Sequence, residues 1–146
     1  MRVAVEPSLR AEDYPFSHRL RVRFAETDAM GVAHHAAYLP YLETARVEYL
    51  RSLGHPYRDL RDRDGLEFAV VGVDVRYHAP LRFDDMFTVS CALAERARAT
   101  FSLAYRVELG AQLILSGRTR HAVLDRETGA PRRLPAWLSA LPFEGA

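Results

Sequence analysis

Apolar and polar residues alternate in five stretches of the chain, and this period of two is typical of β-strands. In residues 18–24, Leu20, Val22 and Phe24 point one way and three arginines point the other. That pattern predicts a strand with one solvated face and one apolar face. Four further strands are predicted over residues 68–77, 86–93, 100–109 and 113–124. The two-residue link at 110–111 predicts that the last two form a hairpin.

Between the first strand and the other four, over about residues 36–53, the period changes to that of a helix. The apolar stripe is wide, which predicts a helix covered on most sides; its members are Tyr38, Leu42, Ala45, Tyr49 and Leu53. Pro40 must lie in the first turn, where no backbone hydrogen bond is lost. Gly54 stands where a helix-ending glycine belongs. A short closing helix is predicted over 136–141.

The order of strand, long helix and four strands predicts an α+β protein. Its antiparallel five-stranded sheet wraps around the one central helix. One helix cannot cover both faces of such a sheet, so the outer face is either solvated or paired with a second sheet. We expect an irregular N-terminal arm over residues 1–17 and one domain over 18–146. Residues 57–65 are dense in charge and predict a loop, with a helical turn as an alternative.

The composition narrows the functional classes. The 146 residues are 49% hydrophobic and 27% charged, as in an ordinary globular protein, and no stretch is apolar enough to span a membrane. The net charge of +1 gives no reason to expect nucleic-acid binding. A single cysteine, Cys91, rules out an internal disulfide and suits the cytoplasm. All 20 basic residues are arginine, which excludes lysine Schiff-base chemistry.

The candidate chemistry lies in the loop before the helix. Asp28 comes seven residues before His35, and His35 directly precedes the helix. A helix start presents free N–H groups and positive charge that can hold an oxyanion. A nearby carboxylate can activate water or attack a carbonyl. Thioester cleavage needs these two parts and no metal. The simpler alternative is that Asp28 only caps a turn of the loop.

A metal site is the alternative for the two adjacent histidines, His34 and His35. Adjacent side chains are expected to point apart, and the sequence offers no partner motif for zinc. We therefore predict no metal.

Two sequence motifs, one in this loop and one in the helix after it, are specific enough to indicate a protein family. The segment Glu26-Thr-Asp-Ala-Met-Gly-Val-Ala-His-His-Ala-Ala-Tyr-Leu39, followed by Tyr41-Leu-Glu-Thr-Ala-Arg-Val-Glu-Tyr-Leu50, resembles the signature of the 4-hydroxybenzoyl-CoA thioesterase family. It is most similar to the Tol-Pal-associated acyl-CoA thioesterase branch. The resemblance extends over about residues 18–141. It includes Val75-Arg-Tyr-His-Ala-Pro-Leu-Arg-Phe-Asp-Asp85 and Asp125-Arg-Glu-Thr-Gly-Ala-Pro-Arg-Arg-Leu-Pro135.

The resemblance implies a hotdog fold and a homodimer or dimer of dimers, the latter a homotetramer, with active sites at the dimer interface. It implies hydrolysis of an acyl-CoA to the free acid and coenzyme A. No separate cofactor is implied, because coenzyme A is part of the substrate. Acyl carrier protein is an alternative carrier of the acyl group.

The resemblance also assigns residues. Asp28 matches the catalytic aspartate, acting as nucleophile or general base, and the backbone N–H of His35 matches the oxyanion donor. Gly31 matches the glycine that turns the loop beside the substrate. Tyr38 matches a usual tyrosine. His34 replaces a more usual aromatic residue, which affects the fit of the substrate.

Other positions are assigned less directly. Ala37 stands where many relatives carry Asn or Ser, and Asp84 where many carry Gly. Glu43 on the helix is a candidate substrate contact, since some hotdog enzymes use a helix carboxylate of the partner subunit; the alternative is an ion pair with a neighbouring arginine. Arg96 and Arg98, in the turn between two strands, are candidates for binding the coenzyme A phosphates, with a plain solvated turn as the alternative.

Two other functions stay open. A hotdog dehydratase for 3-hydroxyacyl thioesters needs a histidine and an acid on the helix, for which His35 and Glu43 are poor substitutes. A non-catalytic acyl-CoA-binding module is the second, because one fold hosts many functions. The carboxylate at Asp28 speaks against it.

Overall fold

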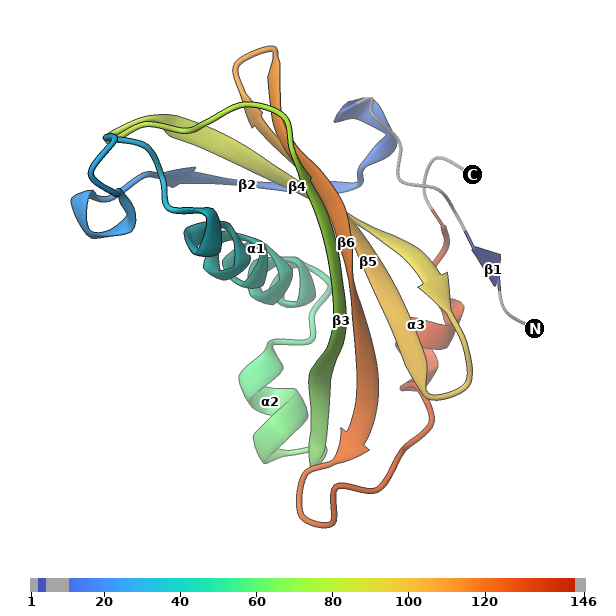
Figure 1. The fold of residues 1–146 in the computed structure, drawn as a ribbon. Helices are drawn as coiled ribbons and strands as arrows, with labels where there is room; N and C mark the ends of the chain where they lie inside the picture. The colour runs from blue at the N-terminus through green and yellow to red at the C-terminus, as the bar shows by residue number, and fades with distance from the viewer. Residues whose placement is uncertain (1–2, 5–10, 144–146) are drawn as a thin grey trace.

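A curved antiparallel sheet wraps around one long helix, α1 (Tyr38–Ser52), in the hotdog arrangement that the sequence predicts (Figure 1). The structure is a computed structural model and describes residues 3–4 and 11–143. The strands of the sheet are β1 (Val3–Ala4), β2 (Phe16–Arg21), β3 (Leu66–Tyr77), β4 (Met86–Arg96), β5 (Thr100–Leu109) and β6 (Gln112–Asp125). The predicted hairpin of β5 and β6 is confirmed.

The strand order places β3 at an edge. Strand β4 pairs with both β1 and β2 on one side and with β5 on the other, and the order continues through β6 to β3. Among the described residues, β3 pairs with β6 alone. One row of its backbone N–H and C=O groups therefore faces away from the sheet.

Helix α1 buries the predicted stripe against the concave side of the sheet. Tyr38, Leu42, Ala45 and Tyr49 are all at most 4% exposed. Burying each of the larger side chains contributes roughly 1.5–3 kcal/mol. The helix ends as predicted at Gly54, where φ is +86° and the N–H groups of residues 54 and 55 bond the carbonyls of residues 51 and 50.

The first predicted strand is wrong at its C-terminal end. Strand β2 stops at Arg21, and Phe24 is 77% exposed in a short 3-10 helix, η2 (Phe24–Glu26), although Val22 is buried as expected. The reason is local: the carboxylate of Glu26 bonds the backbone N–H and the guanidinium of Arg23, which turns the chain.

The predicted apolar face of β3 is only partly covered. Val71, Val73 and Tyr77 are 47–57% exposed, whereas Val75 packs against the core, which also receives Leu66 and Phe68 from the start of the strand. The pairing of β3 with β6 shifts register between residues 70 and 72, so Val73 and Tyr77 pair with buried residues of β6. They stay exposed because β3 lies at the edge of the sheet.

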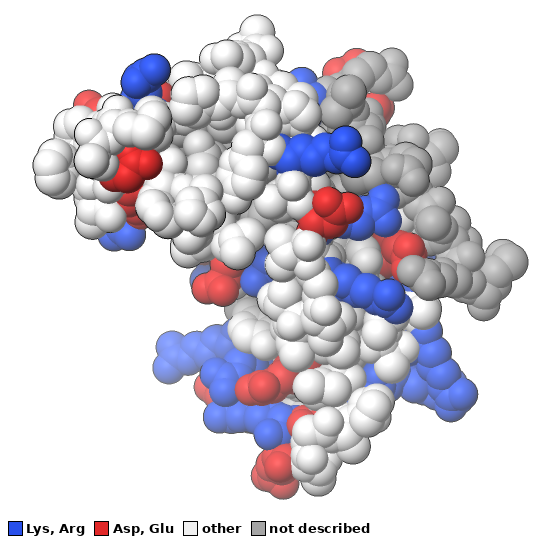
Figure 2. Space-filling model, viewed as in Figure 1, with Lys and Arg blue, Asp and Glu red and all other residues white. Residues whose placement is uncertain are grey.

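The remaining segments differ little from expectation. Residues 57–65 contain a helix, α2 (Tyr57–Asp62), and the closing helix is α3 (Ala136–Ala140). Of the predicted irregular arm, residues 1–2 and 5–10 lie outside the described residues. The rest is not irregular throughout, since it includes β1, a 3-10 turn, η1 (Ala11–Asp13), and the first two residues of β2. In the described part of the chain, no helix is long and apolar enough to cross a membrane. Figure 2 shows arginine and acidic side chains mixed over the visible face.

Candidate active site

The loop from residue 24 to residue 37 joins β2 to α1 and is closed at its base. The N–H of His34 donates to the carbonyl of Glu26 at 2.7 Å, and the N–H of Ala33 donates to the carbonyl of Leu81 at 2.7 Å. An isolated bridge also pairs Thr27 with Ala33. The loop is thereby attached to the connection between β3 and β4, so its tip has a fixed position.

Glu26 anchors the loop to α1. Its carboxylate accepts hydrogen bonds from the Arg23 N–H at 2.9 Å and from the Tyr41 hydroxyl at 2.8 Å. Burial raises the pKa of the Glu26 carboxyl, but these hydrogen bonds outweigh burial and leave the pKa below its ordinary value. Glu26 is therefore a structural anion at neutral pH, a role that was not assigned from the sequence.

Asp28 sits at the exposed tip of the loop. Its Oδ1 accepts the N–H of Met30 at 2.8 Å, and its backbone bonds Val32 and Gly31 at 2.9 Å each. Gly31 has φ of +77°, a conformation that glycine adopts without strain, as predicted for the residue that turns the loop. Asp28 thus does cap a turn, and the cap uses only one of its two carboxylate oxygens.

The start of the helix region is capped by a histidine. A 3-10 turn, η3 (His35–Ala37), precedes α1, and Nδ1 of His34 accepts the N–H of Ala36 at 3.1 Å. The N–H of Ala37 bonds the carbonyl of His34 at 2.8 Å. The N–H of His35 has no hydrogen-bond partner among the described residues, so this donor is unpaired in the described part of the chain.

The two histidine rings lie together rather than apart. Their centroids are 4.2 Å from each other and the planes are tilted by 32°, so the expectation that adjacent side chains diverge was wrong here. The two rings are not part of a metal-ligand cluster, because no group of three or more His, Cys, Asp or Glu in the described chain is arranged to hold an ion.

A cavity of about 370 Å³ opens between the loop and the end of β3. From the loop and helix side it is lined by Asp28, Val32, Ala33, His35 and Tyr38, and from the strand side by Tyr77, His78, Ala79 and Pro80. The structure therefore brings Asp28, His35 and Tyr38 to one pocket. We call this the Asp28 pocket.

Two tyrosines fix the shape of the Asp28 pocket. The Tyr77 hydroxyl donates to the carbonyl of His35 at 2.8 Å, while the Tyr38 hydroxyl accepts the N–H of Leu81 at 3.1 Å. Their rings meet edge to face at 5.4 Å. Burial raises the pKa of Tyr38, so its hydroxyl stays protonated at neutral pH. Together these bonds tie the start of α1 to the end of β3.

Sequence reasoning missed the strand side of the pocket. Tyr77 and His78 belong to the motif of residues 75–85, which supports the family resemblance, but neither residue was assigned to the site. His78 Nε2 lies 2.8 Å from the Ser116 hydroxyl. A polar pair at the end of a strand, followed by Ala79 and Pro80, is the signal that could have drawn attention to these residues.

Three predicted site residues do not line the Asp28 pocket of the same chain. Glu43 lines a second cavity and lies 3.8 Å from Arg46, so the predicted ion pair is present. Arg96 is the last residue of β4 and does not lie in the turn, where it was predicted. It donates to the carbonyls of Leu138 and Leu141 and lies over the Phe143 ring, and so it holds the C-terminal segment. The turn that carries Arg98 is at the opposite end of the sheet from the loop (Figure 1).

Residues 22–141 match the family model described as the thioesterase-like superfamily. A putative esterase from Aquifex aeolicus is 42% identical over 110 residues, which cover 75% of this chain and 85% of that protein. The acyl-CoA thioesterase YbgC of Haemophilus influenzae is 30% identical over 128 residues, which cover 88% and 94%.

Solved structures agree with the sequence relatives. A probable thioesterase from Bartonella henselae superposes with a TM-score of 0.78 at 29% identity, over 82% of this chain and 98% of the other. The residues matched by the family model include the central helix and the loop that carries Asp28. The chain therefore belongs to the thioesterase-like superfamily and is a thioester hydrolase.

Proposed function

We propose that the protein hydrolyses acyl-CoA thioesters to a free acid and coenzyme A in the Asp28 pocket. The observation that carries the proposal is the meeting of Asp28 and the unpartnered N–H of His35 in one cavity. Within the superfamily, we place the chain in the 4-hydroxybenzoyl-CoA thioesterase family and its Tol-Pal-associated branch, on the resemblance of residues 26–50. The YbgC relatives support an acyl-CoA substrate.

In the proposed reaction, the thioester carbonyl lies between Asp28 and His35. Asp28 takes a proton from a water molecule whose oxygen bonds to the carbonyl carbon, or one Asp28 oxygen bonds to that carbon directly. The carbonyl oxygen gains negative charge, which the N–H of His35 stabilises; one such donor is typically worth about 10²–10³ in rate. The C–S bond then breaks, and the thiolate of coenzyme A leaves and takes up a proton. In the direct version this leaves an acyl–Asp28 anhydride, which a water molecule then hydrolyses to the free acid and the restored Asp28 carboxylate.

The turn made by Asp28 suits either role. Because Met30 binds only Oδ1, the second oxygen is available, and the bond to Met30 holds the carboxylate in one orientation. A positioned carboxylate loses less entropy on reaching the transition state. The two versions differ in one measurable way. After a single turnover in water enriched in heavy oxygen, Asp28 itself gains the label only if it is the nucleophile.

We further propose that the working unit is a homodimer joined along β3, either alone or as half of a homotetramer. The outer edge of β3 is unpaired in the described chain and carries the exposed side chains of Val70, Val71, Val73 and Tyr77. Such an edge is self-complementary, because an antiparallel second copy can add hydrogen bonds and bury these side chains. Full overlap of residues 70–77 places residue 70 of one copy opposite residue 77 of the other.

The deciding experiment is a thiol-release assay across short, long and aromatic acyl-CoAs, with the matched acyl carrier protein thioesters alongside. We expect release of coenzyme A by the wild type and its loss in Asp28→Asn. Tight binding of acyl-CoA without thiol release would overturn the proposal in favour of a binding module. Hydration of crotonyl-CoA without thiol release would indicate a dehydratase.

Residues that bind coenzyme A are tested in the same assay. Arg96→Gln and Arg98→Gln are expected to raise KM with kcat unchanged if these arginines bind the phosphates. Because Arg96 also holds the C-terminal segment, a Tm measurement on each variant separates loss of binding from loss of structure. An unchanged KM in both variants would remove the turn from the proposed site. A cytoplasmic location stays a prediction.

A further inference from the structure

The turn that leads into α1 is held largely by one residue, His34. Its Nδ1 accepts the N–H of Ala36 at 3.1 Å, and its carbonyl accepts the N–H of Ala37 at 2.8 Å. Its own N–H donates to the carbonyl of Glu26 at 2.7 Å. His34 therefore fixes the peptide unit that carries the N–H of His35, and also the peptide unit after it.

The His34 side chain takes the place of the usual helix cap. Asn, Asp, Ser and Thr are preferred at this position, because a short side-chain oxygen accepts an N–H two or three residues further on. Here an imidazole nitrogen makes that bond. Ala37, directly before α1, provides no side-chain cap. Among the described residues, the His34 ring is thus the side chain that caps the start of the helix region.

The capped turn forms part of the wall of the Asp28 pocket. The His34 ring packs against the His35 ring with centroids 4.2 Å apart, and His35 lines the pocket. The Tyr77 hydroxyl donates to the carbonyl of His35. The turn is therefore held from the loop side by His34 and from the strand side by Tyr77, and the position of the His35 N–H depends on both.

The bond from Ala36 to His34 requires a neutral imidazole. Nδ1 accepts a hydrogen bond only while the ring proton is on Nε2, because a protonated imidazole carries N–H donors on both nitrogens. Protonation would set two N–H groups against each other and place a positive charge at a helix start, where the backbone is already positive. The His34 ring is exposed, and imidazoles in general gain a proton between about pH 8 and pH 5. Acidification therefore removes the cap.

Other ionisable groups around the turn do not replace Nδ1 as the acceptor. The carboxylate of Glu26 is bonded to Arg23 and Tyr41, and Oδ1 of Asp28 accepts the N–H of Met30. The negative charge of Asp28 attracts a protonated ring, whereas the helix start repels it. The groups that are charged or gain a proton in this pH range are Arg23, Glu26, Asp28 and His35 in the loop, His78 just after β3, and Arg82 in the connection to β4.

We propose that His34 is a positioning residue for the proposed hydrolysis, because its neutral imidazole holds the turn in which the N–H of His35 binds the carbonyl oxygen of the substrate. The proposal rests on the proposed function and adds that the oxyanion donor is in place only while His34 carries no charge. His34 makes and breaks no bond with the substrate. Activity is therefore retained at high pH and decreases as the His34 ring gains a proton.

Two variants separate the hydrogen bond from the ring. His34→Asn keeps an acceptor for the N–H of Ala36 but does not titrate, so its kcat/KM at pH 8 should stay within about twofold of the wild type. His34→Phe keeps an aromatic ring beside His35 but has no acceptor. Loss of a helix cap then predicts a fall of about fivefold at pH 8. The fall should be in kcat rather than KM, because the donor acts on charge that forms in the transition state.

The main readout is kcat/KM between pH 8 and pH 5.5, measured on the acyl-CoA that the wild type cleaves fastest, with a Tm at each pH. The wild type should lose about fivefold over this range, as the cap opens. His34→Asn should stay near the upper level, and His34→Phe should begin near the lower level and show no such step. The wild-type step in His34→Asn, or wild-type activity of His34→Phe at pH 8, would overturn the proposal.

Two further histidine variants serve as matched controls. His35→Asn removes the other imidazole of the pair and keeps the backbone N–H, so the acid step should remain. His18→Asn makes the same change on β2, at a residue that does not line the Asp28 pocket, and should leave the pH profile as in the wild type. Loss of the step in His35→Asn would assign it to His35 and contradict the role of His34.

A measurement without substrate keeps this proposal separate from the proposed function. In protein labelled with ¹⁵N, NMR should find Nδ1 of His34 unprotonated at pH 8, with a titration midpoint equal to that of the acid step. The N–H of Ala36 should exchange with solvent more slowly in the wild type and His34→Asn than in His34→Phe. These results support the cap even if no acyl-CoA is cleaved. A proton on Nδ1 at pH 8, or equal exchange in all three proteins, overturns it even if turnover is robust.

Discussion

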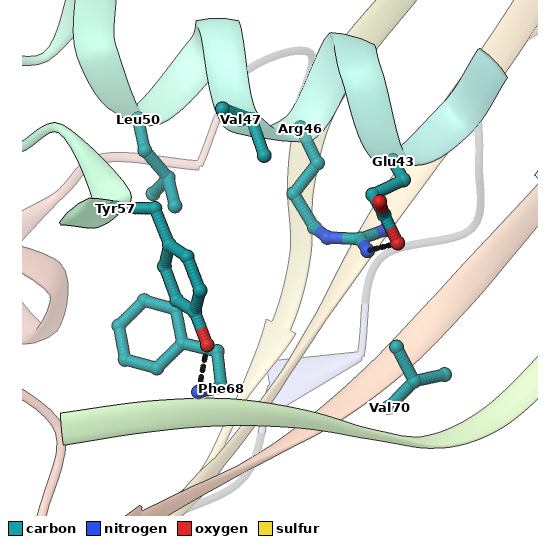
Figure 3. A pocket seen from close by; sticks show the side chains of 7 residues that line it. All are labelled: Glu43, Arg46, Val47, Leu50, Tyr57, Phe68 and Val70. Carbon is teal, nitrogen blue, oxygen red and sulfur yellow. Dashed lines mark hydrogen bonds and ion pairs between the residues drawn. The ribbon is translucent and has the colours of Figure 1, made fainter. Parts of the chain in front are cut away.

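The Asp28 pocket and the second cavity, of about 250 Å³ and lined by Glu43, Arg46 and Val70 among others (the Arg46 cavity; Figure 3), lie on the same helix and strand but are built in different ways. The first depends on a loop tip, backbone N–H groups and an exposed carboxylate. The second depends on side chains of regular elements, with a guanidinium held by buried hydroxyl groups. Loops tolerate exposed reactive groups, whereas a buried polar group needs neighbours that fix it. Substitutions should therefore affect activity alone in the first region and stability as well in the second.

The largest effect is expected from Asp28→Asn. The amide oxygen of asparagine can still accept the N–H of Met30, so the free energy of unfolding should change by less than about 0.5 kcal/mol. The rate should fall about 100-fold or more, because the carboxylate that activates water is lost. Urea unfolding and the thiol-release assay measure the two quantities. A stability loss as large as the activity loss would break the contrast between the regions.

The next largest effect, on the free energy of unfolding, is expected from a substitution in β6 where this strand pairs with β3. A Cβ added at Gly117 on β6 would lie 2.4 Å from the carbonyl oxygen of Asp74 and 2.8 Å from Val75, both on β3. Backbone atoms cannot move aside as a flexible side chain can, so Gly117→Ala should cost about 1–3 kcal/mol. Gly72→Ala, which meets only the Cβ of Arg120 at 3.5 Å, is the matched control. Equal Tm values for the two variants would contradict the crowding.

The buried histidine makes stability depend on pH. Burial, and then the charge of Arg46, lowers the pKa of His121 from 6.5 to about 3. Below pH 6.5 the unfolded chain takes up a proton that the folded chain does not. The stability is therefore fully present above pH 6.5 and falls by about 1.4 kcal/mol per unit as the pH decreases toward 3.

Urea unfolding of the wild type and of His121→Gln between pH 8 and pH 5 checks this slope. The variant should lose the share of the pH dependence that comes from this one residue. Parallel curves for the two proteins would show that His121 does not carry it.

The smallest effect is expected from Tyr77→Phe. The change removes one hydrogen bond, from the hydroxyl to the carbonyl of His35, and keeps the ring contact with Tyr38. A bond worth about 1 kcal/mol predicts a fall of about fivefold in kcat/KM, because the N–H of His35 is less well positioned. A fall in kcat/KM with an unchanged Tm would place Tyr77 with the active site. A fall in Tm alone would make it a structural residue.

The elements with strong periodicity could be predicted from the sequence. The residue range of β5 and the Gly54 end of α1 came out as expected, because alternation and helix caps are local signals. Phe24 was misplaced because two hydrogen bonds between Arg23 and Glu26 end the strand early. The exposure of Val73 and Tyr77 on β3 was not predicted, because it depends on the position of β3 at the edge of the sheet, which local alternation does not indicate.

The same distinction explains the site. The loop with Asp28, Gly31 and His35 is contiguous in sequence, so its residues could be found together. Tyr77 and His78 join it only through the fold, because the bond from Tyr77 to His35 spans 42 residues. The ring contact of His34 and His35 was also missed, since adjacent residues diverge in regular structure but not in the turn that begins η3.

The unpaired edge of β3 has a consequence for how the protein behaves in solution. If pairing of two copies buries this edge, folding and association are linked by mass action. The temperature of unfolding should then rise with protein concentration, and dilution should lower activity per molecule. An assay performed at nanomolar protein would then measure the population of dimers as much as the chemistry of Asp28.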